Sequence, residues 1–362
     1  MSNYKKNDMP TLLVTGGAGF IGANFVIQVR NSKWANIVNL DKLTYASNLQ
    51  NLAKLQDDPN YYFIRGDINN SELVSYLLEE YQPDALINFA AETHVDSSII
   101  SPRNFIHTNV VGTFELLEAS KAYWQKLTSP RKEKFRFLHI STDEVYGSLS
   151  STDPGFREDT PYAPNSPYSA SKAAADHLVR SYYHTYNLPT LTTNCSNNYG
   201  PMQFPEKLIP LTILNALNGK SLPIYGDGRN IRDWLYVKDH CDAICLVLIE
   251  GCTGETYNIC GINEQTNLVV VEKICAILDE LAPQDNFQYS SLITFIKDRP
   301  GHDHRYAIDC SKISRNLGWK PKENFDSGLL KTVQWYLNNS AWVDSVCTGT
   351  YQSWIKQNYG TR

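Results

Sequence analysis

The sequence predicts an α/β protein in which a doubly wound parallel sheet is joined to a smaller C-terminal α/β lobe. Two observations predict this fold. The first half of the 362-residue chain alternates short runs rich in β-branched and aromatic residues with segments of helical periodicity. After about residue 196 this alternation lapses, and Pro, Gly and Asn become frequent.

The strands of the expected sheet are short apolar runs bounded by turn-forming residues. In chain order they cover residues 11–16, 36–41, 61–67, 84–90, 136–142 and 188–196. Amphipathic segments at residues 24–32, 71–81 and 105–123 lie between them and are expected to be helices. The last segment is long and apolar, so it belongs either to the core or to an interface between subunits.

Composition narrows the class of protein. Charged residues make up 20% of the chain and hydrophobic residues 42%, as in ordinary globular enzymes. The net charge of -5 argues against nucleic acid or an anionic membrane as a general partner. No run resembles a signal peptide or reaches membrane-spanning length, so we expect a cytoplasmic protein.

The eight cysteines are scattered, without a C-x-x-C pair or a Cys/His cluster at zinc spacing. We therefore expect no metal site. Cys195, Cys245 and Cys275 stand in apolar surroundings and are expected to be buried, reduced thiols.

A glycine-rich turn, "TGGAGFIG", follows the first strand and precedes the first helix. Glycines at positions 16, 17, 19 and 22 let the backbone turn tightly and approach a pyrophosphate at the helix N-terminus. The second strand ends in Asp41, 19 residues after Gly22, where a carboxylate can accept the ribose hydroxyls. The pattern predicts a Rossmann-like fold that binds NAD.

Two charged residues near this turn leave alternatives open. Lys42 could pair with the 2′-phosphate of NADP, although Asp41 favours NAD. Asp67 ends the third strand, where it would either lie near the adenine edge or cap the strand end.

The chain is expected to divide into two interleaved units. Residues 1–196 form the NAD-binding Rossmann domain, to which the chain returns at about residues 232–252. Residues 197–362 form the second lobe.

In "YSASK", Tyr168 and Lys172 stand four residues apart, on one face of a helix that begins after a Pro-rich entry. A phenol titrates near pH ~10, so a tyrosine base at neutral pH needs its phenolate stabilised by roughly 4 kcal/mol. A neighbouring ammonium and a positively charged nicotinamide can provide that stabilisation.

Two adjacent acids, Asp143 and Glu144, directly follow Thr142 at the end of the fifth strand. Like charges at neighbouring positions are costly when both are desolvated, so they are either solvated loop acids or a pair that transfers protons.

These motifs resemble the extended short-chain dehydrogenase/reductase superfamily. Within it, "AAETHVD", "STDEVYG", "NCSNNYGP", "FPEKLIP", "GRNIRDWLYVKDH" and "RPGHDHRYAID" are similar to the dTDP-glucose 4,6-dehydratases, and the resemblance runs from about residue 11 to residue 340. It implies oxidation of a nucleotide-linked glucose at carbon 4, elimination of water across carbons 5 and 6, and return of hydride to carbon 6. Tyr168 would take the proton of the 4-hydroxyl and Thr142 would hold that oxygen, while Glu144 would be the base and Asp143 the acid of the elimination.

NAD would be regenerated in each turnover and stay bound. The residues expected to bind it are Gly16, Gly19, Phe20, Ile21, Gly22, Asp41, Lys42, Thr44, Asp67, Ile68, Ala90, Ala91, Thr108, Tyr168, Lys172 and Asn198. Thr142, Asp143, Glu144, Tyr168 and Lys172 form the expected catalytic set.

The expected substrate is a nucleotide sugar, dTDP-glucose, held in the cleft by the second lobe. A diphosphate favours Arg and amide donors. The expected contacts are Thr93, Thr142, Asn197, Lys207, Pro223, Tyr225, Arg232, Asn267, Asp298 and His302. Arg232 could instead pair with Asp233 or Asp239.

The chain departs from the usual pattern at Ser97, Met202 and His304, which concerns sugar and nucleotide contacts only. One methyl group separates thymidine from uridine, so the choice between these nucleotides rests on the resemblance alone.

Two alternative functions are a nucleotide-hexose 4-epimerase, which needs no acid pair after Thr142, and a non-catalytic NAD-bound sensor. By resemblance, the helices around residues 103–123 and 168–186 pair two subunits into a homodimer.

Overall fold

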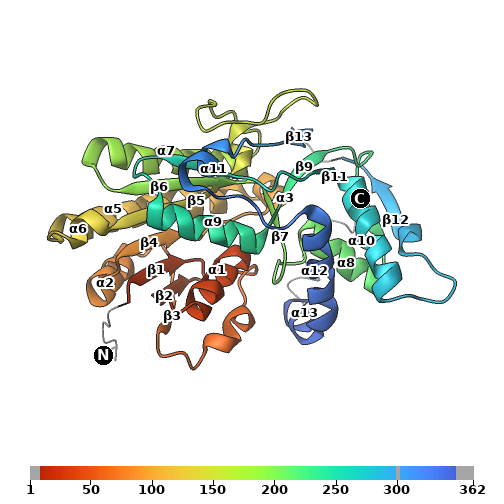
Figure 1. Ribbon diagram of the computed structural model, residues 1–362, viewed down its shortest axis with the longest axis horizontal. Coiled ribbons are helices and arrows are strands. Elements are labelled where there is room, and N and C mark those ends of the chain that lie inside the picture. Colours follow the sequence, from red (N-terminus) through yellow and green to blue (C-terminus); the bar gives the residue numbers. More distant parts are fainter. Residues whose placement is uncertain (1–8, 299–301, 348–362) are drawn as a thin grey trace.

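The computed structural model describes residues 9–298 and 302–347. Its main body is a seven-stranded sheet in the order β10-β6-β5-β4-β1-β2-β3 (Figure 1). Every neighbouring pair in it is parallel. The strands are β1 (Thr11–Thr15), β2 (Asn36–Asp41), β3 (Tyr61–Arg65), β4 (Ala85–Asn88), β5 (Arg136–Thr142), β6 (Thr190–Cys195) and β10 (Thr256–Ile259). The strand order reverses between β1 and β4, which is where doubly wound sheets bind ligands.

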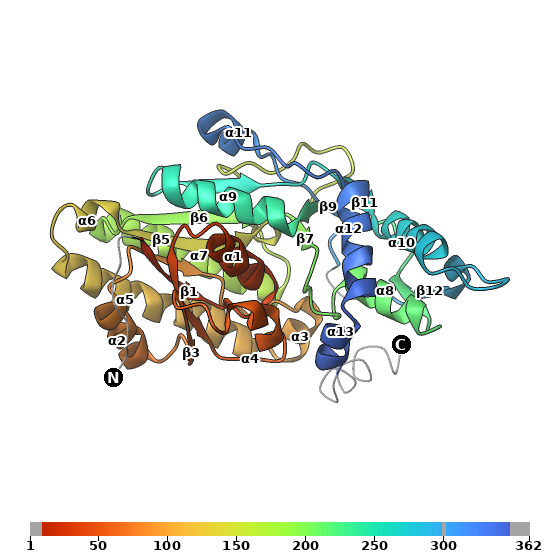
Figure 2. The same cartoon turned by 60° about the horizontal axis from the view of Figure 1, so that its bottom comes forward.

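Helices cover both faces of this sheet, so its strands are buried apolar runs. Figure 2 shows α9 (Val237–Glu250) on one side, with α2 (Ser71–Tyr81) and α5 (Gly112–Lys126) on the other. Helix α1 (Phe20–Asn31) packs against α9, and α5 packs against α7 (Pro167–Tyr186). The predicted Rossmann-like architecture is confirmed.

The segment at residues 105–123 is not the single helix that its periodicity predicts. It consists of the end of α4 (Pro102–Phe105), a π-helical turn η2 (Ile106–Val111), and α5. The wider turn directs Asn109 inward, where its amide oxygen accepts from the Glu92 amide at 2.8 Å and its nitrogen donates to Ser171 Oγ at 2.9 Å. Such tertiary contacts favour a π-turn that local spacing does not reveal.

The second lobe has its own apolar core, formed largely by α8, α10 and α12. Two small sheets face it: β11-β9-β13, with β7 beside β9, and the parallel pair β12-β8. The strands are β7 (Asn197–Tyr199), β8 (Leu222–Tyr225), β9 (Ile231–Tyr236), β11 (Glu264–Thr266), β12 (Ile293–Ile296) and β13 (Arg305–Tyr306). The helices are α8 (Leu208–Leu217), α10 (Asn267–Leu281), α12 (Phe325–Asn338) and α13 (Ser340–Val346).

Shorter helical segments complete the description. They are η1 (Leu49–Leu55), α3 (Val95–Ile100), α6 (Arg131–Lys134), η3 (Asp143–Tyr146), η4 (Tyr289–Leu292) and α11 (Ser311–Leu317).

The return to the main sheet differs from the predicted segment at residues 232–252. Strand β9 belongs to the second lobe, and α9 and then β10 make the return, so the chain stays with the main sheet as far as Ile259. Strand β10 is an edge strand whose outer side is covered by side chains. Asn258 N donates to Glu158 Oε1 at 2.9 Å, and Lys312 Nζ donates to the Thr256 carbonyl at 2.6 Å.

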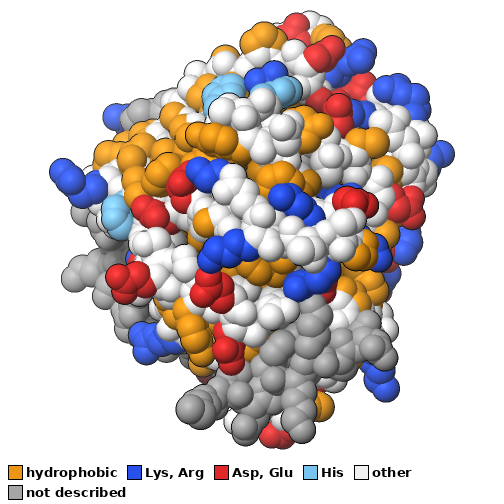
Figure 3. All heavy atoms as spheres, turned by 90° about the vertical axis from the view of Figure 1, so that its left-hand side faces the viewer, with side chains coloured by type: hydrophobic (Ala, Val, Ile, Leu, Met, Phe, Trp, Pro, Cys, Tyr) orange, Lys and Arg blue, Asp and Glu red, His pale blue; other side chains and the backbone are white. Residues whose placement is uncertain are grey.

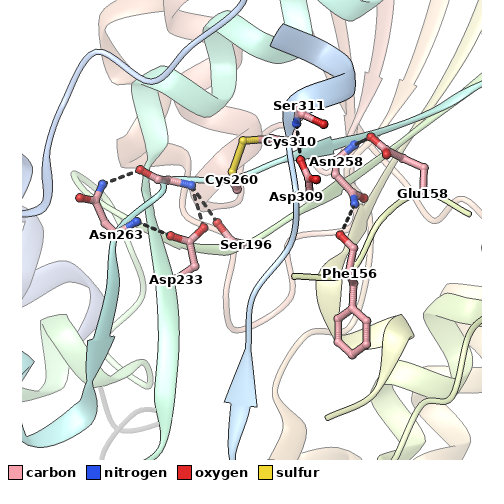
Figure 4. Close-up of a disulfide and its surroundings, with 11 residues drawn as sticks. Phe156, Glu158, Ser196, Asp233, Asn258, Cys260, Asn263, Asp309, Cys310 and Ser311 are labelled. Atoms are coloured by element: carbon pink, nitrogen blue, oxygen red, sulfur yellow. Dashed lines mark hydrogen bonds between the residues drawn. A yellow bond between two sulfur atoms is a disulfide. The ribbon is translucent and has the colours of Figure 1, made fainter. Parts of the chain in front are cut away.

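A disulfide joins Cys260, after β10, to Cys310, before α11, across 50 residues of sequence (Figure 4). Their Cα atoms lie 5.7 Å apart. The sequence analysis did not predict this bond, because a spacing of 50 residues carries no recognised signature. Cys195, Cys245 and Cys275 are free thiols, as expected, and Cys245 is only partly buried.

Candidate active site

A cavity of about 280 Å³ opens where the carboxyl ends of the main strands meet the second lobe. Every residue expected to be catalytic or to bind NAD lines this one cavity, and so do Thr93, Asn197 and Lys207. Predicted residues from nine separate segments, between positions 16 and 207, therefore come together in one cavity.

The glycine turn leaves room for a ligand backbone. Gly16 has φ +71°, and a Cβ there would lie 2.7 Å from Ala90 N. A Cβ on Gly22 would lie 2.4 Å from the Gly16 carbonyl oxygen. Side chains at these positions are excluded, and the turn leads straight into α1, whose first amides can bind an anion. The turn fits the pyrophosphate of a dinucleotide.

Asp41 fixes the same turn. Its Oδ2 accepts from the Ala18 amide at 2.9 Å, and its Oδ1 accepts from the Leu43 amide at 2.8 Å. Lys42 Nζ lies 2.8 Å from Asp67 Oδ2, so its charge is balanced within the protein. Burial raises the pKa of Asp67, but the Asn69 amide and Lys42 together bring it below its usual value. An ion-paired Lys42 gives little attraction for a 2′-phosphate, which suits NAD.

The acids after β5 lie in very different surroundings. Asp143 is 2% exposed, and its Oδ2 has no hydrogen-bond partner among the described residues, whereas Glu144 is only partly buried. Thr142 Oγ1 donates to Asp143 Oδ1 at 3.3 Å. Burial, Glu144 and Asp233 raise the pKa of Asp143 well above its usual value. A carboxyl group with its pKa raised in this way keeps its proton to higher pH than an ordinary aspartate, which suits it to donate a proton.

Tyr168 and Lys172 lie on α7, both buried, with the tyrosine hydroxyl hydrogen-bonded to Thr142. Burial, Glu144 and Cys195 raise the pKa of Tyr168 well above its usual value in the ligand-free protein. Lys172 Nζ donates to the Ile140 carbonyl at 2.8 Å, which holds it beneath the cavity floor. A phenolate here needs positive charge nearby.

Six predicted substrate contacts lie in the second lobe outside the lining of this cavity: Pro223, Tyr225, Arg232, Asn267, Asp298 and His302. Residues 299–301, within the predicted stretch from Asp298 to His302, lie outside the described residues.

Arg232 is 5% exposed, donates to the carbonyls of Asp303 and His304, and lies 4.3 Å above the Tyr306 ring. Its predicted alternative partners instead bind backbone amides: Asp233 accepts from Gly261, and Asp239 from Lys322. His302 Nδ1 lies 2.6 Å from Asp298 Oδ1.

The sequence analysis missed Glu206, which lines the cavity beside Lys207. It is 5% exposed, burial raises its pKa, and the Tyr45 hydroxyl is hydrogen-bonded to it. The motif "FPEKLIP" contained it, but only the lysine matched a phosphate-binding role.

Within the described residues, no helix is both long and apolar enough to cross a membrane. The same residues contain no group of three or more His, Cys, Asp or Glu side chains arranged to hold a metal ion.

The fold and cavity define an NAD-dependent enzyme of the short-chain dehydrogenase/reductase type. A sequence model described as GDP-mannose 4,6 dehydratase matches residues 13–332, and the chain belongs to this family. The chain is 57% identical over 359 residues to the dTDP-glucose 4,6-dehydratase of Shigella flexneri, covering 97% of this chain and 99% of the relative.

Solved structures give the same result. The dTDP-glucose 4,6-dehydratase of Bacillus anthracis, in complex with NAD, superposes with a TM-score of 0.82 at 48% identity, covering 93% of this chain and 99% of that one. The enzyme of Streptomyces venezuelae, also with NAD bound, gives 0.84 at 44% identity, with 93% and 99% covered. The predicted resemblance, fold and cofactor are confirmed.

Proposed function

We propose that this protein dehydrates dTDP-glucose to dTDP-4-keto-6-deoxyglucose, and so supplies a precursor for deoxysugars such as rhamnose. The observation that carries the proposal is the pair Asp143 and Glu144 beside Thr142, Tyr168 and Lys172 in one cavity. Oxidation alone needs only the last three. Elimination of water needs one further base and one further acid, and the pair supplies two carboxyl groups in unlike surroundings.

The glycine turn, Asp41 and the cavity wall fit NAD. The turn packs too closely on Ala90 for a side chain at Gly16, and α1 begins directly after it, so its first amides face the cavity. When bound, NAD supplies the hydride acceptor for oxidation at carbon 4 and the hydride donor for reduction at carbon 6. Asp41 would hold the adenosine ribose, while Tyr168 and Lys172 would face the nicotinamide end. Ala90 and Ala91, small residues at the end of β4, would lie against the cofactor.

The chain's own residues move the protons. Thr142 holds the oxygen on carbon 4, and Tyr168 removes its proton when positive charge from Lys172 and the cofactor offsets burial. The resulting ketone acidifies the hydrogen on carbon 5, which Glu144 takes. Asp143, whose pKa is raised by burial, protonates the leaving 6-hydroxyl. Carbon 5 takes a proton back when hydride returns to carbon 6. Both acids lie on η3, so one turn presents them to adjacent carbons.

The second lobe would hold the nucleotide. Lys207 Nζ donates to the Thr93 carbonyl at 3.0 Å and lines the cavity, and the Asn197 Oδ1 has no hydrogen-bond partner among the described residues. Both can reach the diphosphate. By resemblance, Arg232 and Asn267 would contact the diphosphate. Pro223, Tyr225, Asp298 and His302 would lie beside the nucleotide, beyond the present lining of the cavity.

Dehydration is preferred to 4-epimerisation and to a sensor. An epimerase has no use for a buried neutral acid such as Asp143 beside the site, and the curated relatives compared are dehydratases. A sensor has no need of the complete set of proton-transfer groups.

We also propose that the protein is a cytoplasmic homodimer. Apolar side chains on η2 and α5 are exposed in the single chain: Ile106 at 49%, Val111 at 38% and Phe114 at 39%. Figure 3 views the end of the molecule that carries α5 and α6, where hydrophobic side chains gather among charged ones. A second copy would cover such a surface. Light scattering on purified protein tests this: a monomer at micromolar concentration would contradict it.

The function is tested by incubation in deuterated water with dTDP-glucose, and with UDP-glucose in parallel, followed by NMR. A 4-keto-6-deoxy sugar with deuterium at carbon 5 is expected from dTDP-glucose. Recovery of a galactose configuration with the 6-hydroxyl retained would favour the epimerase instead. Unchanged dTDP-glucose in the presence of bound NAD would reject the proposed substrate.

A further inference from the structure

A cluster of buried polar side chains lies behind Lys172, on the side away from the cavity opening. Lys172 is 3% exposed, His139 1% and Asp176 4%. His139 comes from the middle of β5, and Asp176 follows Lys172 by one turn of α7, so the two lie on one face of that helix. The proposed mechanism uses only Lys172 from this cluster.

The contacts join the cluster into one network. His139 Nε2 lies 3.3 Å from Lys172 Nζ and 3.4 Å from Asp176 Oδ1. Asp176 Oδ2 accepts from Ser141 Oγ at 2.9 Å. On the other side of the ring, Asn88 Nδ2 lies 3.2 Å from His139 Nδ1. The Tyr162 hydroxyl is also hydrogen-bonded to Asp176. Ser141 and Tyr162 thus hold the carboxyl group of Asp176 within reach of the imidazole that contacts Lys172.

The charges in this network can be assigned from their surroundings. Burial and Lys172 lower the pKa of His139 to about 4, so the ring is neutral near neutral pH. Burial raises the pKa of the Cys195 thiol on β6, so it is neutral too. Tyr168, on α7, is also protonated in the ligand-free protein. Asp176 is the acidic side chain of this network, and it faces Lys172 through His139.

A buried ammonium without a counter-charge loses its proton readily. Burial lowers the pKa of Lys172, and Asp176 opposes this by raising it. Asp143 and Glu144 of η3 act instead on Tyr168, whose pKa they raise. Asp143 and Glu144 on η3 therefore act on Tyr168, whereas Asp176 on α7 acts on Lys172.

We propose that Asp176 is a positioning residue for the reaction: it is the buried counter-ion of Lys172, and Ser141 and His139 hold its carboxylate in place. The inference rests on the proposed function, in which Lys172 must carry its proton to stabilise the Tyr168 phenolate. Asp176 acts through the lysine and touches neither the sugar nor the cofactor.

The first test is the pH dependence of dTDP-glucose turnover in Asp176→Asn. Loss of the carboxylate lowers the pKa of Lys172, so the alkaline limb of the kcat profile should move to lower pH, by about one unit or more. Asp176→Glu keeps the charge and should restore the limb to near its wild-type position. Asp242→Asn on α9 removes an acid that pairs with exposed Lys322, and should leave the profile unchanged.

A folded, NAD-retaining Asp176→Asn with the wild-type alkaline limb would overturn the proposal. A general loss of activity without a shift of the limb would do the same, because it indicates a structural role only. Failure of the proposed function is distinguished beforehand, since wild-type protein would then not convert dTDP-glucose at any pH.

If Asp176→Asn does not fold, a measurement on the wild-type protein can still test the proposal. Lysine labelled with ¹³C at Cε reports the charge of each ammonium by NMR, and Lys172→Arg identifies the signal of Lys172. We expect Lys172 to remain charged through neutral pH, despite burial that would otherwise favour the neutral amine. A neutral Lys172 at pH ~7 would overturn the assignment of Asp176 as its counter-ion.

Discussion

Replacement of Asp143 by Asn tests the elimination chemistry most directly. The amide has nearly the shape of the acid, and its oxygen can still accept from Thr142, so the packing around this 2% exposed side chain should survive. The amide has no proton to give to a leaving hydroxyl. Oxidation at carbon 4 depends on Tyr168, Thr142 and Lys172 and should continue.

General acid catalysis contributes about 10²- to 10⁴-fold to a rate, which corresponds to about 3–5 kcal/mol of barrier. Burial of Asp143 and its raised pKa place it at the strong end, because its proton is kept available for transfer to the leaving group. We expect product formation in Asp143→Asn to fall by about 10³-fold or more. Reduced cofactor should accumulate, visible by its absorbance, because the hydride is not returned.

Stability gives a second readout. The folded-state pKa of Asp143 is raised, so its neutral form contributes stability that is complete at low pH and is lost as pH rises through that pKa. Asp143→Asn cannot ionise, so its Tm should exceed that of wild type at alkaline pH and approach it at acidic pH.

The matched control for both readouts is Asp227→Asn. Asp227 is an exposed acid paired with Arg229, so its replacement should change neither turnover nor the pH dependence of Tm. Product formation by Asp143→Asn at a wild-type rate would refute the assignment of Asp143 as the acid. A Tm lower than wild type at every pH would refute the argument that its carboxyl is held neutral.

Three further predictions follow from the same site and fold. Glu144→Gln should stop deuterium incorporation at carbon 5 while oxidation at carbon 4 persists; incorporation at a wild-type rate, measured by NMR, would exclude Glu144 as the base. Gly16→Ala should abolish co-purification of NAD, since its Cβ meets Ala90 N at 2.7 Å, and full NAD content by absorbance would contradict the proposed pyrophosphate turn. Reduction of the Cys260–Cys310 disulfide opens a cross-link across 50 residues and should lower the free energy of unfolding by up to about 4 kcal/mol. The midpoint of denaturant unfolding is measured with and without reductant, and an unchanged midpoint would show that the bond contributes nothing. Cys310→Ala is the control, because its midpoint should not respond to reductant.

Much of the main sheet could be predicted from the sequence. Strands β1 to β6 each lie where the local composition predicts them. All are largely buried except the edge strand β3, which is only partly buried. Strand β10 was missed because its four residues carry no such run, and its place is fixed by pairing with β6 across more than 60 residues. The π-turn η2 was missed for a similar reason, since Asn109 is held by Glu92 and Ser171 rather than by helix neighbours.

The active site shows the same division between local and long-range information. The motifs placed Thr142, Tyr168 and Lys172 correctly in one cavity, because short segments at strand ends carry them. The raised pKa of Asp143 could not be predicted in full, because its largest cause is burial in the fold. Asp233, which lies 90 positions later in the chain, adds to it after the neighbouring Glu144. The predicted substrate contacts of the second lobe come from several separate short segments. No single motif could therefore predict which of them line the cavity.

The outer edge of β10 affects how strongly the protein tends to aggregate at high concentration. A strand edge with free amides and carbonyls is a template for another chain, and stacking of such edges starts aggregation. Here Glu158 occupies the Asn258 amide, Lys312 occupies the Thr256 carbonyl, and the Cys260–Cys310 bond fastens the covering segment over both. A chain truncated ahead of Cys310 would lose both the disulfide and the Lys312 contact at once. Precipitation of such a fragment would then reflect an uncovered sheet edge rather than a damaged active site.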